Sequence, residues 1–180
     1  SEQWYLEKLK MPLAWSISVG KIGFPYPFPY ETKVKVAVID TGIDYKHEDL
    51  QANTPFSFQI GQGQDFTESD SDPMDEDGHG TSVAGVLGAV SDNQKGVAGV
   101  IWNVSLMPIK AQEGKYGDLF AFIKGIFYAS ANGAKIINIS NGAVRSHYLA
   151  MRSALQYANV AGVLVVGSAG NDGIENKYSF

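Results

Sequence analysis

Four short apolar runs, rich in Val and Ile, predict β-strands at residues 34–39, 104–109, 135–139 and 163–167. Their positions are mostly apolar instead of alternating with polar residues, which is typical of strands that are buried on both faces of a sheet. Between these runs lie segments whose apolar residues recur at helical spacing. The sequence predicts helices at residues 80–90, 119–131 and about 146–160.

The ends of the predicted helices carry the expected signals. Asp118 is a good N-cap for the second helix, and Asn132-Gly133 is a typical C-terminal signal. Ser146 can cap the third helix, and Gly162 follows its end. Because strands alternate with helices, we expect an α/β fold with a largely parallel β-sheet flanked by helices.

In such sheets, functional sites form beyond the carboxyl ends of the strands. Polar or glycine-rich segments follow the first, third and fourth predicted strands, at residues 40–42, 140–142 and 168–173. These segments are therefore the first place to look for chemistry.

Composition narrows the function classes. The chain has 180 residues, 44% of them hydrophobic, a formal net charge of −5 and no cysteine. The acidic balance argues against a nucleic-acid partner. The lack of cysteine excludes disulfides, thiolate catalysis and cysteine-ligated zinc. No apolar run approaches the roughly 20 residues of a membrane span, so we expect a soluble domain with no membrane partner.

Asp40 and His79 carry the candidate chemistry. Asp40 ends the first apolar strand, and His79 opens the first predicted helix within the sequence Asp-Gly-His-Gly-Thr-Ser. Taken singly, such a carboxylate is more often a turn residue and such a histidine a structural hydrogen-bonding group. Taken together, they fit a carboxylate that fixes the tautomer of an imidazole and stabilises its charged form, as a general base requires.

Both segments resemble the subtilisin-like serine proteases, or subtilases. Residues 36–44 match the aspartate motif of that family and residues 77–85 its histidine motif, in the order Asp then His that is usual for subtilisin. Further blocks resemble the family at residues 3–15, 96–100, 136–142 and 169–171. The resemblance implies a subtilisin-like fold and a serine endopeptidase that hydrolyses peptide bonds.

The resemblance also implies a role for each matching residue. Asp40 would orient His79, His79 would take the proton of a serine hydroxyl, and Asn171 would donate a hydrogen bond to the oxyanion. An extended peptide or protein substrate would lie between two segments, which consist of Lys115, Tyr116 and Gly117 and of Ser140, Asn141 and Gly142. An N-terminal prodomain and secretion from the cell are implied as well.

The nucleophilic serine is not found. In the family it lies in a Gly-Thr-Ser-Met-Ala type of motif far downstream of the oxyanion asparagine, whereas only residues 172–180 follow Asn171 here. Gly80-Thr81-Ser82-Val83-Ala84 has a similar pattern, but it lies in the histidine helix, so we do not expect Ser82 to be the nucleophile. We expect residues 1–180 to be the N-terminal portion of a single peptidase domain, inactive without the part that bears the nucleophile.

An acidic segment lies between the two motifs. Residues 65–77 carry carboxylates at positions 65, 68, 70, 72, 75, 76 and 77, which repel one another unless a cation neutralises them. A solvated surface loop is the plain alternative, but the spacing Asp70-x-Asp72 suits calcium. The segment resembles the calcium loop of thermitase-like subtilases, which implies Asp65, Asp70, Asp72 and Met74 as ligands. A second family site would use Asp49 and Asn93, so calcium is the expected cofactor.

A non-catalytic module that keeps the subtilase fold and binds peptides or a partner is the alternative function. The presence of Asp40, His79 and Asn171 in one chain favours the enzyme, because a binding module needs none of them together. A small hydrolase that uses Ser82 is a third possibility, and it predicts that this chain alone reacts with a fluorophosphonate.

Overall fold

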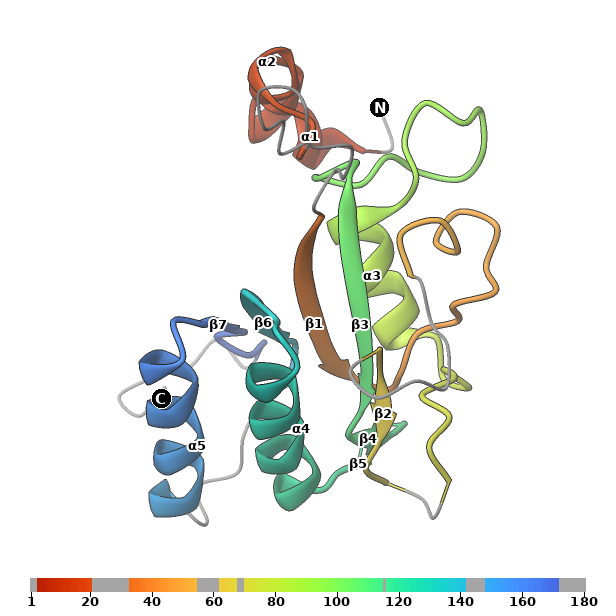
Figure 1. The fold of residues 1–180 in the computed structure, drawn as a ribbon. Coiled ribbons are helices and arrows are strands. Elements are labelled where there is room, and N and C mark those ends of the chain that lie inside the picture. Colours follow the sequence, from red (N-terminus) through yellow and green to blue (C-terminus); the bar gives the residue numbers. More distant parts are fainter. Residues whose placement is uncertain are drawn as a thin grey trace, which may run out of the picture.

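The computed structural model describes residues 3–20, 33–54, 62–67, 70–114, 116–141 and 148–171. Five strands form one sheet in the order β2-β3-β1-β6-β7, and every pair is parallel. The strands are β1 (Val34–Asp40), β2 (Gln64–Asp65), β3 (Val104–Lys110), β6 (Ile136–Ile139) and β7 (Leu164–Gly167). The predicted α/β fold with a parallel sheet is confirmed (Figure 1).

Helices cover both faces of this sheet. Helix α3 (His79–Gly88) lies on one face, and α4 (Leu119–Ala131) and α5 (Tyr148–Val160) lie on the other (Figure 1). Helix α4 has the bounds that its sequence signals predict. The Asp118 carboxylate accepts a hydrogen bond from the Phe120 N–H at 3.0 Å, which satisfies a free amide of the first turn.

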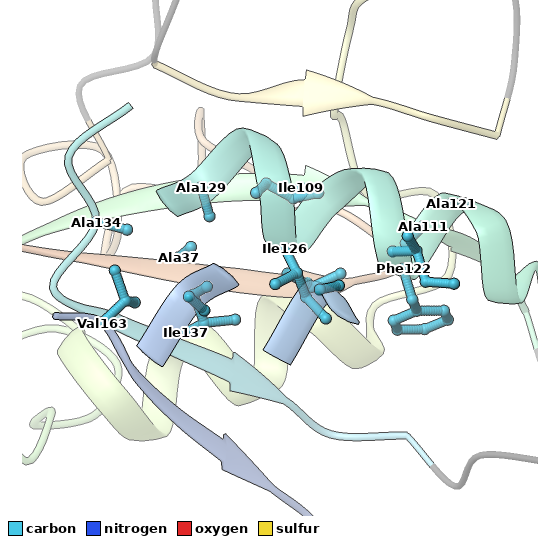
Figure 2. Packing of buried hydrophobic residues seen from close by; sticks show 14 of the residues in the cluster. Ala37, Ile109, Ala111, Ala121, Phe122, Ile126, Ala129, Ala134, Ile137 and Val163 are labelled. Atoms are coloured by element: carbon cyan, nitrogen blue, oxygen red, sulfur yellow. The ribbon is translucent and has the colours of Figure 1, made fainter. Parts of the chain in front are cut away.

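Strand β1 divides the core into two clusters because its side chains alternate between the two faces. Ala37 and Ile39 belong to the cluster beneath α4 and α5, and Val36 and Val38 to the cluster beneath α3. Figure 2 shows part of the first cluster, in which Ile126 of α4 lies over the sheet. Full burial of an isoleucine of this kind stabilises the fold by about 1.5–3 kcal/mol.

Strand β7 differs from the prediction that all four strands are buried on both faces. Leu164 is 61% exposed and Val166 45% exposed, whereas Val163 and Val165 pack in the cluster beneath α5. One face of β7 is therefore covered, and no described element covers the other. Apolar residues alone could not reveal this, because they indicate only that a surface favours burial.

The structure adds short elements that the sequence did not predict. Helices α1 (Trp4–Lys8) and α2 (Met11–Ile17) precede the sheet, and β4 (Gln112–Glu113) pairs antiparallel with β5 (Tyr116–Gly117). Gln3 fixes the N-terminal segment, because its side-chain amide donates to Ala98 O at 2.9 Å and accepts from the Ala98 N–H at 3.0 Å. Among the described helices, none combines the length and the apolar character needed to cross a bilayer.

The strand register brings four chain segments to one edge of the sheet. Asp40 pairs with Lys110 of β3, and Ile39 pairs with Ile139 of β6, which in turn pairs with Gly167 of β7. The segments that follow these strands therefore leave the sheet at the same edge, as expected for parallel strands.

Candidate active site

Asp40 and His79, which are far apart in the sequence, meet at this edge. Asp40 ends β1 and its side chain is fully buried, whereas the side chain of His79, the first residue of α3, is 48% exposed. His79 Nδ1 lies 2.7 Å from Asp40 Oδ1, which also accepts the Thr41 N–H at 2.8 Å. Because an ionised carboxylate only accepts hydrogen bonds, this contact assigns the proton to Nδ1 and leaves Nε2 as the basic nitrogen.

The surroundings of His79 favour its charged form. The hydrogen bond to Asp40 raises the pKa of His79 above its ordinary value of 6.5, although partial burial acts in the opposite direction. The negative charges of Asp40, Asp77 and Asp75 raise this pKa further. The site is thus arranged to stabilise an imidazolium at this position.

Close backbone contacts fix the position of α3 against the end of β1. The Gly80 N–H donates to Thr41 Oγ1 at 2.9 Å, and the Ile43 N–H donates to Pro73 O at 3.0 Å. Gly42 has a φ of +105°, and a Cβ at this position would come within 2.5 Å of Pro73 O. The glycine is therefore required here both by backbone conformation and by space.

Asp75 organises the turn that leads into His79. Its Oδ1 accepts the N–H groups of Asp77 and Gly78 at 3.0 and 2.9 Å. Its Oδ2 accepts the N–H and the hydroxyl of Thr81 at 2.8 and 2.5 Å. Burial tends to raise the pKa of Asp75, but the hydrogen bonds from Gly78 and Thr81 outweigh it and hold the pKa below its ordinary value of 3.8. The carboxylate thereby links the turn to the first turn of α3.

Gln112 connects Asp40 with the segment that follows β6. Gln112 Oε1 accepts a hydrogen bond from Asn141 Nδ2, and Gln112 Nε2 lies 3.5 Å from Asp40 Oδ1. The backbone oxygen of Asn141 accepts the Ser168 hydroxyl at 3.1 Å. Asn141, which follows β6, is thus connected to Gln112 after β3 and to Ser168 after β7, and through Gln112 to Asp40 at the end of β1.

The predicted substrate-binding segments lie next to each other where they are described. Tyr116 and Gly117 form β5, and a Cβ on Gly117 would lie 2.9 Å from Asn141 Nδ2. Ser140 Oγ accepts a hydrogen bond from Asn138 Nδ2 at 2.8 Å. Lys115 and Gly142 lie outside the described residues. Asn171 is described as exposed and follows Ser168 in the segment after β7.

The predicted ligands of the acidic segment form local hydrogen-bonded turns. Asp65 is buried, and its Oδ1 accepts the Thr67 N–H at 2.6 Å, while its Oδ2 lies 3.8 Å from Lys110 Nζ. Asp70 Oδ1 accepts the Asp72 N–H at 2.9 Å, and Asp72 Oδ1 accepts the Met74 N–H at 3.1 Å. Within the described part of the chain, no three His, Asp or Glu side chains are gathered to bind one metal ion.

The ligands predicted for a second metal site do lie together. The buried Asp49 carboxylate accepts Asn93 Nδ2 at 2.7 Å through Oδ1 and the Val97 N–H at 2.8 Å through Oδ2. The segment after α3 is thereby fixed to the turn that contains Asp49.

Ser82, considered above as a possible nucleophile, has its hydroxyl bound within the helix. Ser82 Oγ donates to Gly78 O at 2.8 Å. This contact is an ordinary hydrogen bond to the carbonyl of the residue four positions earlier.

Sequence reasoning did not predict the roles of Thr41, Asp75 and Gln112 in the site. Gln112 follows the second predicted strand, so the strand-end rule that selected the other three segments also applies to it. Asp75 could have been identified as a turn-forming carboxylate ahead of a glycine and a helix start. Thr41 lies in the segment 40–42 that the strand-end rule selected, but no further signal distinguished its hydroxyl.

Comparisons with known proteins place these features in context. Residues 31–180 match the sequence profile of the subtilase family. The chain is 36% identical over 166 residues to a thermophilic serine proteinase of Bacillus sp. (strain AK1), covering 92% of this chain and 37% of the relative. It is 33% identical over 174 residues to thermitase of Thermoactinomyces vulgaris, covering 96% of this chain and 56% of thermitase.

A solved structure has a similar backbone. MycP1 with its N-terminal propeptide removed superposes with a TM-score of 0.71 at 27% identity, covering 95% of this chain and 50% of MycP1. The chain thus spans between 37% and 56% of the length of these three relatives.

Proposed function

This chain belongs to the subtilase family, and from that premise we propose that it is part of a serine endopeptidase that hydrolyses peptide bonds by acyl transfer. The observation that carries the proposal is the 2.7 Å contact between His79 Nδ1 and the buried Asp40 Oδ1. A carboxylate and an imidazole in this relation are the orienting group and the general base of a triad.

The proposed reaction begins with proton transfer to His79 Nε2 from a serine hydroxyl. The serine oxygen attacks the carbonyl carbon of the scissile bond, and the negative charge moves to the carbonyl oxygen. The side-chain amide of Asn171 donates a hydrogen bond to this oxyanion. His79 then gives its proton to the leaving amine, and water hydrolyses the acyl-enzyme by the same steps. Asp40 stays ionised throughout and stabilises the imidazolium.

The substrate is proposed to be an extended peptide bound between residues 115–117 and 140–142. The adjacency of Gly117 and Asn141 supports this placement, because it brings the two segments to the edge of the sheet at which Asp40 and His79 meet. Backbone pairing of this kind gives affinity without demanding particular substrate side chains.

We propose that residues 1–180 form the N-terminal portion of one peptidase domain, with the serine supplied by the remainder. The length comparison supports this, because the chain spans 56% of thermitase and 50% of MycP1. The exposed Leu164 and Val166 of β7 also support it, since further elements of the domain would cover them. On this proposal the isolated chain is inactive.

Calcium is proposed as a structural cofactor. The buried carboxylates of Asp49 and Asp65 are hard oxygen donors of the kind that calcium prefers. Asp70, Asp72, the Met74 carbonyl and Asn93 would complete two sites by adding further oxygens. Bound calcium would fasten these segments and stabilise the folded state.

An N-terminal prodomain and secretion are proposed as well. The solved MycP1 had an N-terminal propeptide that was removed. The relatives include a minor extracellular protease and a major intracellular serine protease, both of Bacillus subtilis (strain 168). Fractionation of the source culture, with activity assayed in the medium and in the cells, would test secretion.

Labelling with a fluorophosphonate tests the central proposal. We expect the complete protein to react at a single serine outside residues 1–180, and His79→Ala to abolish the reaction because the serine is no longer deprotonated. The isolated chain should not react. Failure of the complete protein to react, combined with retained peptide binding, would support the non-catalytic module instead. Reaction of the isolated chain at Ser82 would support the small hydrolase.

A further inference from the structure

Gln112 lies where its side chain can reach two parts of the candidate site. It follows the last residues of β3, whose Lys110 is in register with Asp40, and it opens β4. Gln112 is only 6% exposed. Burying a side-chain amide without hydrogen-bond partners destabilises a protein by about 1–3 kcal/mol. The groups that Gln112 contacts therefore indicate what its side chain does.

The oxygen of the Gln112 amide faces a hydrogen-bond donor, and its nitrogen faces an acceptor. Its Oε1 accepts a hydrogen bond from Asn141 Nδ2, and its Nε2 lies 3.5 Å from Asp40 Oδ1. The reversed orientation would bring Oε1 against the carboxylate and Nε2 against the Asn141 amide, which places acceptor against acceptor and donor against donor. The surroundings therefore select one orientation of the amide.

Packing around this contact leaves little room for movement. A Cβ on Gly117 would lie 2.9 Å from Asn141 Nδ2 and 3.4 Å from the Cβ of Gln112. The pairing of β4 with β5 places Gln112 opposite Gly117. Gln112 thus lies between the Asp40–His79 pair and both of the proposed substrate-binding segments.

We infer that Gln112 is a positioning residue, which holds the Asp40 carboxylate in place for His79 and at the same time fixes Asn141 beside the bound substrate. The inference rests on the proposed peptidase function. Gln112 Nε2 stabilises the charge on Asp40 Oδ1 as a third donor, in addition to His79 and the Thr41 N–H. Gln112 Oε1 holds the Asn141 side chain against Gly117, where an added Cβ would lie 2.9 Å from Asn141 Nδ2.

Two substitutions separate the two contacts. Gln112→Glu keeps an acceptor for Asn141 but replaces the donor facing Asp40 with a second carboxylate. Gln112→Leu removes both contacts and leaves a side chain of similar size. Gln156→Leu is the matched control, because Gln156 is exposed on α5 and is not one of the candidate site residues.

The first measurement is an NMR titration of the His79 imidazole in the full chain. The charged groups that face His79 are Asp40, Asp75 and Asp77. In Gln112→Glu, the additional negative charge beside Asp40 favours the imidazolium. It should raise the midpoint of this titration by about half a pH unit or more, where one unit corresponds to about 1.4 kcal/mol. Gln112→Leu should cause a smaller rise, and Gln156→Leu none. If the midpoint is the same in the Glu variant as in the wild type, the inference is wrong.

The second measurement is steady-state kinetics of the complete enzyme. Gln112→Leu should lower kcat/KM about tenfold, with a rise in KM from the displaced Asn141 and a fall in kcat from the altered Asp40. A lower melting temperature with unchanged kcat, KM and titration midpoint would assign Gln112 a role in packing alone and overturn the inference. A complete protein that has no peptidase activity, but whose His79 midpoint shifts as expected, would overturn the proposed function and leave the positioning of Asp40 supported.

Discussion

The Cα of Gly80 lies so close to the carbonyl oxygen of Gly42 that a Cβ at Gly80 would overlap that oxygen. The Gly80 N–H also donates to Thr41 Oγ1 at 2.9 Å. Gly80 directly follows His79, and Gly42 lies two positions after Asp40. The absence of a side chain at Gly80 therefore sets how closely the histidine helix approaches the strand that carries the aspartate.

Gly80→Ala should destabilise the protein by about 1–3 kcal/mol, because the added methyl group forces the helix and the strand apart. Gly85→Ala is the matched control in the same helix, where a Cβ meets nothing within 4 Å. There the alanine should stabilise the helix by about 0.5–1 kcal/mol. Thermal unfolding of both variants checks this, and equal stability of the two would contradict the packing described here.

Asp40→Asn should lower kcat of the complete enzyme by roughly 10⁴-fold, because the amide no longer fixes the tautomer of His79 or stabilises its charge. Asp118→Asn is the control, since Asn is an equally good N-cap for α4. The control should keep the wild-type rate. Comparable rates for Asp40→Asn and the wild type would exclude Asp40 from the proposed triad.

The acid limb of kcat/KM should have its midpoint above pH 6.5, because the pKa of His79 is raised chiefly by the hydrogen bond that its Nδ1–H donates to Asp40, and only the neutral imidazole acts as a base. The charged pair also stabilises the fold below pH 6.5, and this contribution is lost as the pH rises through the higher folded pKa. In Asp40→Asn the His79 midpoint, followed by NMR, should fall. An unchanged midpoint would show that Asp40 is not the cause of the shift.

Much of the fold followed from the sequence because its signals are local. The apolar run at residues 34–39 and the Asp118 and Asn132-Gly133 boundaries of α4 each report directly on backbone structure. The exposure of Leu164 in β7 did not follow, since an apolar residue does not indicate whether a partner covers it. Likewise, the two-residue strands β4 and β5 are too short to carry a periodic signal.

The candidate site likewise contains residues that local sequence motifs predict and residues whose contacts only the tertiary structure reveals. Asp40 and His79 were identified because each lies in a motif with a recognisable residue pattern, and the structure brings them within hydrogen-bond distance. Gln112 contacts Asn141 and Asp40, both distant from it in the sequence, so its partners emerge only from the tertiary arrangement. The roles of Asn171 and of the proposed calcium ligands stay predictions.

Asn171→Ala should lower kcat by about 10²–10³-fold with little change in KM, because the donor acts on the oxyanion and not on the ground-state carbonyl. Steady-state kinetics of the complete enzyme checks the split between the two constants. Asn159→Ala provides the control, since Asn159 is exposed on α5. A rise in KM at constant kcat would instead assign Asn171 to substrate binding.

Chelation by EDTA should lower the melting temperature of the complete protein, because calcium bound only to the folded state stabilises it by mass action. Adding calcium back should restore the original value. Asp49→Asn and Asp65→Asn should each reduce the loss caused by EDTA, since each removes a charged oxygen ligand from one proposed site. Asp92→Asn is the control: Asp92 is exposed beside Asn93, and its φ of +60° is well tolerated by Asn. A melting temperature that does not respond to EDTA or to added calcium would leave the acidic segment as a solvated surface loop.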